Sequence, residues 1–166
     1  MDHSMRRLVL VLALLACVPP ATASAGSHDL WATVNVCDTP GAPNVIGVRA
    51  SMPGNGTSQR MFVRFEAQWY SNKRKRFVPT GSSSRWISAG SARYRSSQTG
   101  FSFQFADPPA GTSFLMRGKV EYQWRVRRGK RWVVTRRRSR LTRAGISGVE
   151  GGDPAGRSES HCLIRH

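Results

Sequence analysis

The sequence has few acidic residues, few lysines and few cysteines, and each shortage narrows what the protein can be. Its 166 residues include 26 basic but only 9 acidic side chains, so the formal net charge is +17. Only Lys73, Lys75, Lys119 and Lys130 are lysines, and the remaining basic residues are arginines. This arginine bias can reflect genomic base composition, or it can supply guanidinium groups that bind carboxylate or phosphate through two hydrogen bonds, and the sequence leaves both explanations open.

Motifs for catalysis and for nucleotide binding are missing as well. The chain contains no G-x-S-x-G elbow, no H-E-x-x-H pair, no phosphate-binding loop and no dinucleotide fingerprint. His28, His161 and His166 are isolated and show no metal-ligand spacing with the cysteines. His161 precedes Cys162, but neighbours on a strand point to opposite faces, which is a poor arrangement for an activated thiolate. We therefore expect no catalytic residue, no cofactor and no metal.

Long hydrophobic runs are confined to the N-terminus. Arg6 and Arg7 precede the apolar run "LVLVLALLACV" at 8–18, and the small residues of "PPATASAGS" follow it. This order predicts a signal peptide at 1–25, cleaved after Ala25 or alternatively after Ala23, that leaves a secreted domain at 26–166. The "LLAC" segment resembles a lipobox, so a lipid anchor on Cys17 is the minor alternative. No second run is long enough to span a bilayer, and we expect no membrane span in the mature chain.

Two cysteines remain after removal of the signal peptide. Cys37 lies near the mature N-terminus and Cys162 near the C-terminus. In an exported chain, an even pair of distant cysteines predicts a disulfide bond. The alternative is a pair of free, buried thiols.

What the mature chain does contain is alternation of apolar and polar residues at a period of two, which is typical of β-strands. Weaker strands are expected at 76–79, 85–88 and 92–96, whereas "TGSSS" at 80–84 and "SSQTG" at 96–100 are expected to be turns or loops. No segment shows sustained helical periodicity. The residues expected to share an apolar face within each strand are Leu30, Ala32, Val34 and Val36; Ile46, Val48, Ala50 and Met52; Met61, Val63, Phe65, Ala67 and Trp69; and Phe101, Phe103 and Phe105.

The longest alternation is "FLMRGKVEYQWRV" at 114–126, and it is followed by a glycine turn and by "RWVVTR". The residues expected to share its apolar face are Phe114, Met116, Gly118, Val120, Tyr122, Trp124 and Val126. Gly129 can take a positive φ, so 113–137 is predicted to form a β-hairpin. "SHCLI" at 160–164 is predicted to form a closing strand that Cys162 ties to the first strand. About seven to nine short strands with frequent turns predict a single all-β domain, an antiparallel sandwich of two sheets.

This hairpin resembles the last hairpin of immunoglobulin-like and fibronectin type III-like domains. The segments "ATVNVCDTPGAPNVIGVRASMPG" and "GGDPAGRSESHCLI" at the two ends also resemble small exported bacterial proteins of that class. The resemblance implies an immunoglobulin-like sandwich over 30–165, with Tyr122 as a structural tyrosine-corner residue. It implies no reaction, cofactor or catalytic residue, and the Cys…Trp…Cys arrangement of antibody domains is absent.

Basic residues are concentrated on the predicted hairpin, and "NKRKR" at 72–76 forms a second cluster. On the long strand, Arg117, Lys119, Arg125 and Arg127 are expected to face outward. Two interpretations stay open, since arginines can bind an anionic partner or can keep an exposed sheet solvated and unpaired. The candidate anion-binding residues are Arg125, Arg127, Arg128, Lys130, Arg131, Arg136, Arg137, Arg138 and Arg140.

Three hypotheses for function follow. The first is a non-catalytic binding or structural module whose basic surface contacts anionic polymers of the cell envelope or the surroundings. The second is nucleic-acid binding, which the predicted export and the lack of a recognised nucleic-acid motif disfavour. An exported enzyme ranks last. Trp69 and Trp124 are expected in the core, whereas Trp86 and Trp132 are expected to be exposed, where arginine-flanked rings suit a glycan or a single-stranded nucleic acid.

Overall fold

The computed structural model describes residues 30–166, which form nine β-strands and no helix. The predicted signal peptide, its cleavage site and Cys17 lie outside these residues. Sheet A contains β1 (Trp31–Thr39), β2 (Ala42–Pro53) and β6 (Ser96–Gln104), in the order β1-β2-β6. Sheet B contains β4 (Arg76–Ser83), β3 (Arg60–Ser71), β7 (Ser113–Arg128) and β8 (Arg131–Leu141), in that order, with β5 (Ile87–Ser91) beside β3 and β9 (Cys162–Arg165) beside β7. Within this part of the chain, no helix is long and apolar enough to cross a membrane.

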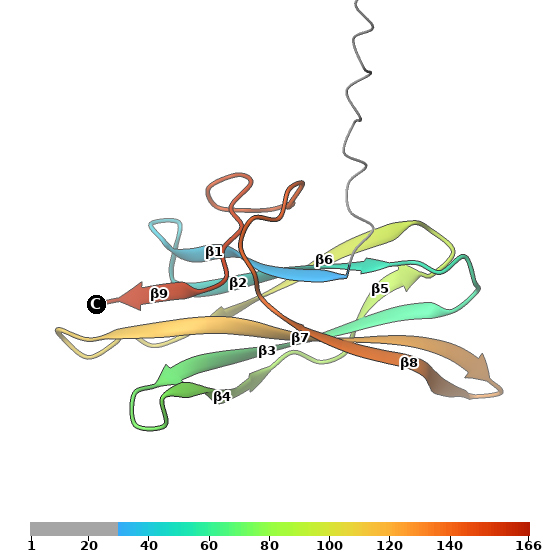
Figure 1. Cartoon of the computed structure of the whole chain (residues 1–166), viewed down its shortest axis with the longest axis horizontal. Coiled ribbons are helices and arrows are strands. Elements are labelled where there is room, and N and C mark those ends of the chain that lie inside the picture. Colours follow the sequence, from blue (N-terminus) through green and yellow to red (C-terminus); the bar gives the residue numbers. More distant parts are fainter. Residues whose placement is uncertain (1–29) are drawn as a thin grey trace, which may run out of the picture.

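All strand pairs within both sheets are antiparallel, and the sheets form two layers (Figure 1). One hydrophobic core lies between the layers and draws on alternate residues of β2, β3 and β7. The predicted apolar faces of β2 and β7 are confirmed, as is most of the face of β3. The buried residues on these strands are Ile46, Val48, Ala50 and Met52; Met61, Val63, Phe65 and Ala67; and Met116, Val120, Tyr122 and Trp124.

The predicted hairpin is present as β7 and β8, and β8 extends further than expected, to Leu141. Gly129 has a φ of 58° at the turn, a conformation that favours glycine. Gly118 serves a different purpose at the middle of β7. A Cβ atom there would lie 2.7 Å from a side-chain methyl of Val48, so glycine lets the two sheets approach closely at this point.

The predicted disulfide bond is also present, and it joins Cys37 of β1 to Cys162 of β9. The expected faces of β1 are wrong at its end, however. A register shift between Val34 and Val36 inserts Asn35 as an extra residue, and the side chains beyond it exchange faces. Val36 therefore faces away from the core, and Cys37 is buried where Cys162 can reach it.

Three assignments made from composition are wrong. Residues 92–95 of the expected strand 92–96 form a turn and a bend, whereas the expected loops "TGSSS" and "SSQTG" lie mostly within β4 and β6. Both of these strands lie at sheet edges, where only one side pairs with a neighbour. Ser, Thr and Gly are accepted there because the side chains are mostly exposed or half-buried rather than packed in a core. Of the three phenylalanines of "GFSFQF", only Phe103 is buried.

Trp69 is the one tryptophan whose expected burial is wrong. It lies on the core-facing side of β3, but 41% of it is exposed. The ring lines an open cleft together with Phe105, Phe114 and Met116 and with Thr80 and Ser82 of β4. Trp124 is buried as expected, since its ring lies in the core and its indole nitrogen donates a hydrogen bond to the carbonyl of Pro53.

The segment between β8 and β9, residues 142–161, crosses the free edge of β1 and the outer face of sheet A (Figure 1). Backbone hydrogen bonds fasten it to β1 in both directions between Val34 and Glu159, each 2.9 to 3.0 Å long. Trp31, Ile146 and Val149 form a second, smaller hydrophobic cluster beneath it. The free edge of β1 is therefore covered by the chain itself.

Tyr122 links the two sheets instead of forming a tyrosine corner. Its hydroxyl donates a 2.6 Å hydrogen bond to the carbonyl of Trp31, which is 91 residues away in the sequence. A tyrosine corner bonds to the backbone only a few residues upstream, so the role implied by the resemblance is wrong. The phenol is buried, and burial raises its pKa, an effect that the positive charge of Arg140 opposes.

Candidate anion-binding surface

The structure places the candidate basic residues on the turn half of the β7–β8 hairpin, where every residue of β8 is exposed. Strand β8 is an edge of sheet B, and the turn end of the hairpin lies beyond the start of β1 (Figure 1). The nine candidates are Arg125, Arg127 and Arg128 of β7, Lys130 of the turn, and Arg131, Arg136, Arg137, Arg138 and Arg140 of β8.

None of these nine side chains forms an ion pair with any residue of 30–166. Ion pairs within this part of the chain include those of Arg49, Arg64 and Lys119, and none of these pairs contains one of the nine residues. The predicted concentration of charge on the hairpin therefore lacks internal compensation, and it produces a strong positive potential over this end of the molecule.

The nine residues do not form one continuous patch, because alternate residues of β8 point to opposite faces of sheet B. Arg136 pairs with Trp124 and Arg138 with Tyr122, so these arginines share the face of core residues. Arg137 instead pairs with Gln123, on the outer face. Arg125 and Arg127 lie on this outer face by alternation along β7, and the register shift at Thr135 of β8 brings Val134 and Trp132 opposite them.

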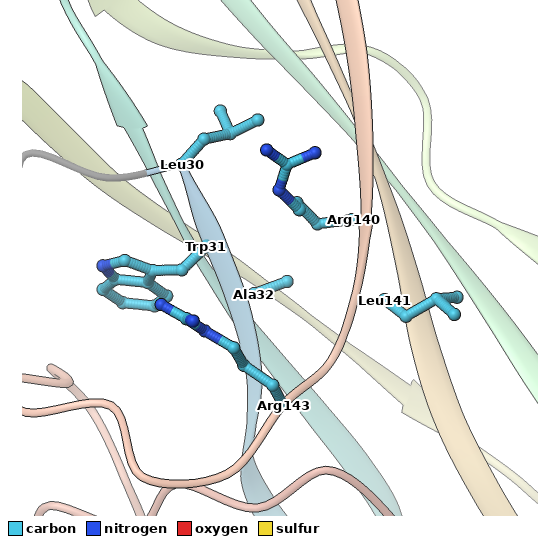
Figure 2. A pocket seen from close by; sticks show the side chains of 6 residues that line it. All are labelled: Leu30, Trp31, Ala32, Arg140, Leu141 and Arg143. Carbon is cyan, nitrogen blue, oxygen red and sulfur yellow. The ribbon is translucent and has the colours of Figure 1, made fainter.

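On the core-facing side, the arginines of β8 border an opening between β8 and β1. Arg140 and Arg143 line a small pocket of about 210 Å³ together with Leu30, Trp31 and Ala32 (Figure 2). Among residues 30–166, no acidic side chain lines this pocket. The backbone N–H of Arg143 donates to the carbonyl of Ala32, and this bond holds the end of β8 against β1. Closer to the turn, the guanidinium of Arg136 lies 4.9 Å from the ring centre of Trp124.

On the outer face, Phe62, Trp86, Arg125, Arg127 and Trp132 form a group that we call the arginine–aromatic platform. The guanidinium of Arg125 lies 4.2 Å from the ring centre of Phe62 and 4.8 Å from that of Trp86. The guanidinium of Arg127 lies 5.8 Å from Trp132, and the rings of Phe62 and Trp132 meet edge to face at 5.8 Å. These distances are within the range of cation–π and aromatic contacts.

Arg125 is the most constrained member of the platform. Its Nε donates a 2.8 Å hydrogen bond to Oε1 of Gln123, and Gln123 is itself buried. Burial lowers the pKa of Arg125, and the charge of Arg137 lowers it further. Arginine stays protonated at neutral pH despite such a shift, so these neighbours fix the direction of the guanidinium without removing its charge.

The expected exposure of Trp132 is confirmed, since 42% of the residue is exposed. Trp86 was also expected to be exposed, but it is half-buried. The outward direction of Arg117, Lys119, Arg125 and Arg127 is also confirmed by their pairing in sheet B. Sequence reasoning missed Phe62 and Arg143. Phe62 could have been found, because it occupies an outward position of its strand between Arg60 and Arg64, where an apolar ring is out of place.

Comparison of the chain with known protein families and with curated protein sequences finds no match to either.

Proposed function

We propose that this protein is an exported, non-catalytic module of immunoglobulin-like fold that binds anionic polymers through the β7–β8 hairpin. The observation that carries the proposal is the set of nine cationic side chains on this hairpin with no ion pair to any residue of 30–166. Fixed cations that lack internal partners attract polyanions and release their counterions on binding.

Other features support the remaining parts of the proposal. Two antiparallel sheets joined by a long terminal hairpin agree with an immunoglobulin-like arrangement. The disulfide between Cys37 and Cys162 is typical of an oxidising compartment, and the predicted signal peptide provides the route to it. In such a location, the anionic polymers are polysaccharides of the envelope or of the surroundings.

The test is a binding titration of the mature protein with polygalacturonate, dextran sulfate, single-stranded DNA and neutral dextran, each at several salt concentrations. We expect binding to the anionic polymers that weakens with salt, and none to dextran. A variant with Arg136, Arg137 and Arg138 changed to Ser should lose at least about tenfold in affinity at low salt, since each basic residue near an anionic surface contributes about 1 kcal/mol.

The matched control removes three charges from the other basic cluster, by changing Lys73, Arg74 and Arg76 to Ser. These residues lie at the β3–β4 turn, are exposed and form no ion pair within the described chain. The control should stay within about twofold of the unchanged protein. Equal losses for the two triple variants would mean that net charge alone governs binding, and the assignment to the hairpin would be wrong.

A further inference from the structure

The cations on the outer face of sheet B have different partners along its length. At the centre of the face, acidic side chains neutralise Arg64 and Lys119, whereas Arg117, nearer β9, lies 4.2 Å from the ring centre of Phe77 and its Nε donates to Gln68. Arg64 and Glu121 approach within 2.7 Å, and Lys119 lies 3.8 Å from Glu66 and 3.9 Å from Glu121. Nearer the hairpin turn, Arg125 and Arg127 contact aromatic rings and no carboxylate of residues 30–166. Aromatic faces orient a guanidinium but leave its charge uncompensated.

The guanidinium of Arg125 is held so that only part of it is available. Phe62 and Trp86 contact it, and Gln123 accepts the hydrogen bond from its Nε. The two terminal nitrogens donate no hydrogen bond to any residue of 30–166, and neither is buried without a partner. They therefore present a free pair of donors that matches two oxygens of one anionic group.

Trp132 provides an apolar surface beside this pair of donors. It pairs with Arg127, two residues along β7 from Arg125, so it is a diagonal neighbour of Arg125 at about 7 to 8 Å between Cβ atoms. Val134, directly opposite Arg125, is exposed as well. One ligand unit that carries both a flat apolar face and an oxyanion can contact the indole and the guanidinium together.

We propose that Arg125 and Trp132 form a subsite for one carboxylated sugar unit, a uronate, whose carboxylate takes the two free donors of Arg125 and whose ring packs on Trp132. This inference rests on the proposed function and names the polymer unit recognised at that surface. Of the three rings of the platform, only Trp132 is widely exposed, whereas Phe62 and Trp86 are half-buried in contact with Arg125. A single exposed ring suits one sugar, while a run of nucleobases requires several stacking rings in succession.

The experiment compares Arg125→Lys with Arg74→Lys, because both changes keep the net charge. Arg74 is exposed, lies at the β3–β4 turn outside the nine candidate residues, and contacts no ring within the described chain. The affinities of both variants are measured for polygalacturonate, dextran sulfate and oligo(dT). We expect Arg125→Lys to weaken polygalacturonate binding about tenfold, because lysine cannot form the two-donor contact, and to change dextran sulfate binding less than about twofold. Arg74→Lys should change neither.

Trp132→Leu provides an independent readout at an exposed position on which folding does not depend. It should reduce the preference for polygalacturonate over dextran sulfate, and an unchanged melting temperature confirms that the variant is folded. Arg125→Lys that leaves polygalacturonate binding intact, or that weakens all three polymers equally, would overturn the subsite while the proposed function stands. A loss confined to oligo(dT) would overturn it in favour of a nucleobase ligand. If the unchanged protein bound none of the three polymers, the proposed function itself would be wrong.

Discussion

The free edges of β1 and β8 lie on the same side of the two sheets, but one edge is covered by other residues and the other is exposed to solvent. The edge of β1 is covered by residues 142–161, which bond to its backbone and bury Trp31. The edge of β8 is bare, and its residues are exposed along the whole strand. Arginines protect β8 from pairing with other chains, because an uncovered edge requires charge to prevent association.

Charge compensation follows the same division. Under the covering segment, Arg49 pairs with Glu150 at 2.7 Å and Thr39 donates a 2.5 Å hydrogen bond to Asp153. The arginines of β8 have no acidic partner within the described chain. The covered edge is thus built for stability, and the bare edge keeps its charges available to the solvent and to a ligand.

Removal of the disulfide, which lies at the covered edge of β1, should cause the largest loss of unfolding free energy. Changing Cys37 and Cys162 to Ala opens a loop of 125 residues, for which the chain-entropy model predicts a loss of about 4 to 5 kcal/mol. Urea unfolding monitored by tryptophan fluorescence measures the change. A loss below about 1 kcal/mol would show that the backbone bonds of residues 142–161 hold the β1 edge without the bridge.

Alanine substitutions of Trp31 and Trp132 compare the contributions of the covered edge and the bare edge to the unfolding free energy. Trp31→Ala empties the small cluster with Ile146 and Val149, and we expect a loss of about 3 kcal/mol. Trp132→Ala removes an exposed ring, so its cost in unfolding free energy should be below about 1 kcal/mol. Equal costs in thermal or urea unfolding would contradict the distinction between a covered and a bare edge.

Tyr122→Phe should have an intermediate effect. The change keeps the ring in the core but leaves the carbonyl of Trp31 without its donor, at a cost of about 1 to 3 kcal/mol. Hydrogen exchange should show faster opening at the start of β1 than in β3. If the stability were unchanged, the bond between the sheets would not contribute to holding β1 in place.

The triple change of Arg136, Arg137 and Arg138 to Ser should have the smallest effect on folding. These side chains are exposed, so the unfolding free energy should change by no more than about 1 kcal/mol, which includes the contact of Arg136 with Trp124. The variant should associate more readily at high concentration, since the edge loses its charges. Sedimentation velocity measures this association, and a variant that stays monomeric would argue against the protective role of the arginines.

The sequence predicts what depends on local alternation and on cysteine count. The hairpin, the core faces of β2 and β7, and the pairing of Cys37 with Cys162 were all available from the residues. What it could not predict depends on contacts between distant segments. Trp69 lines an open cleft and is exposed although its parity matches the core face, and the bulge at Asn35 occurs where β1 pairs with β2.

The candidate surface was predictable only where it depends on local alternation and not where it depends on contacts between distant segments. Trp132 lies on the outer face only because the extra residue Thr135 shifts the register of β8, whereas the outward direction of Arg125 follows from parity along β7. The contact of Arg125 with Phe62 and Trp86 does not, because three strands or connections separated in the sequence must meet to form it. The division of the β8 arginines between two faces was implicit in their alternation, although composition alone suggested one patch.

The bond between the first and the last strand has a consequence for the order of events during synthesis. Because Cys162 follows Cys37 by 125 residues, Cys37 has no described partner until β9 has been made. The covering segment 142–161 is made just before β9, so the edge of β1 is open during nearly all of that interval. Closure of the β1 edge therefore comes after the synthesis of β2 to β8, and a chain that stops before residue 142 exposes an apolar strand instead of a charged one.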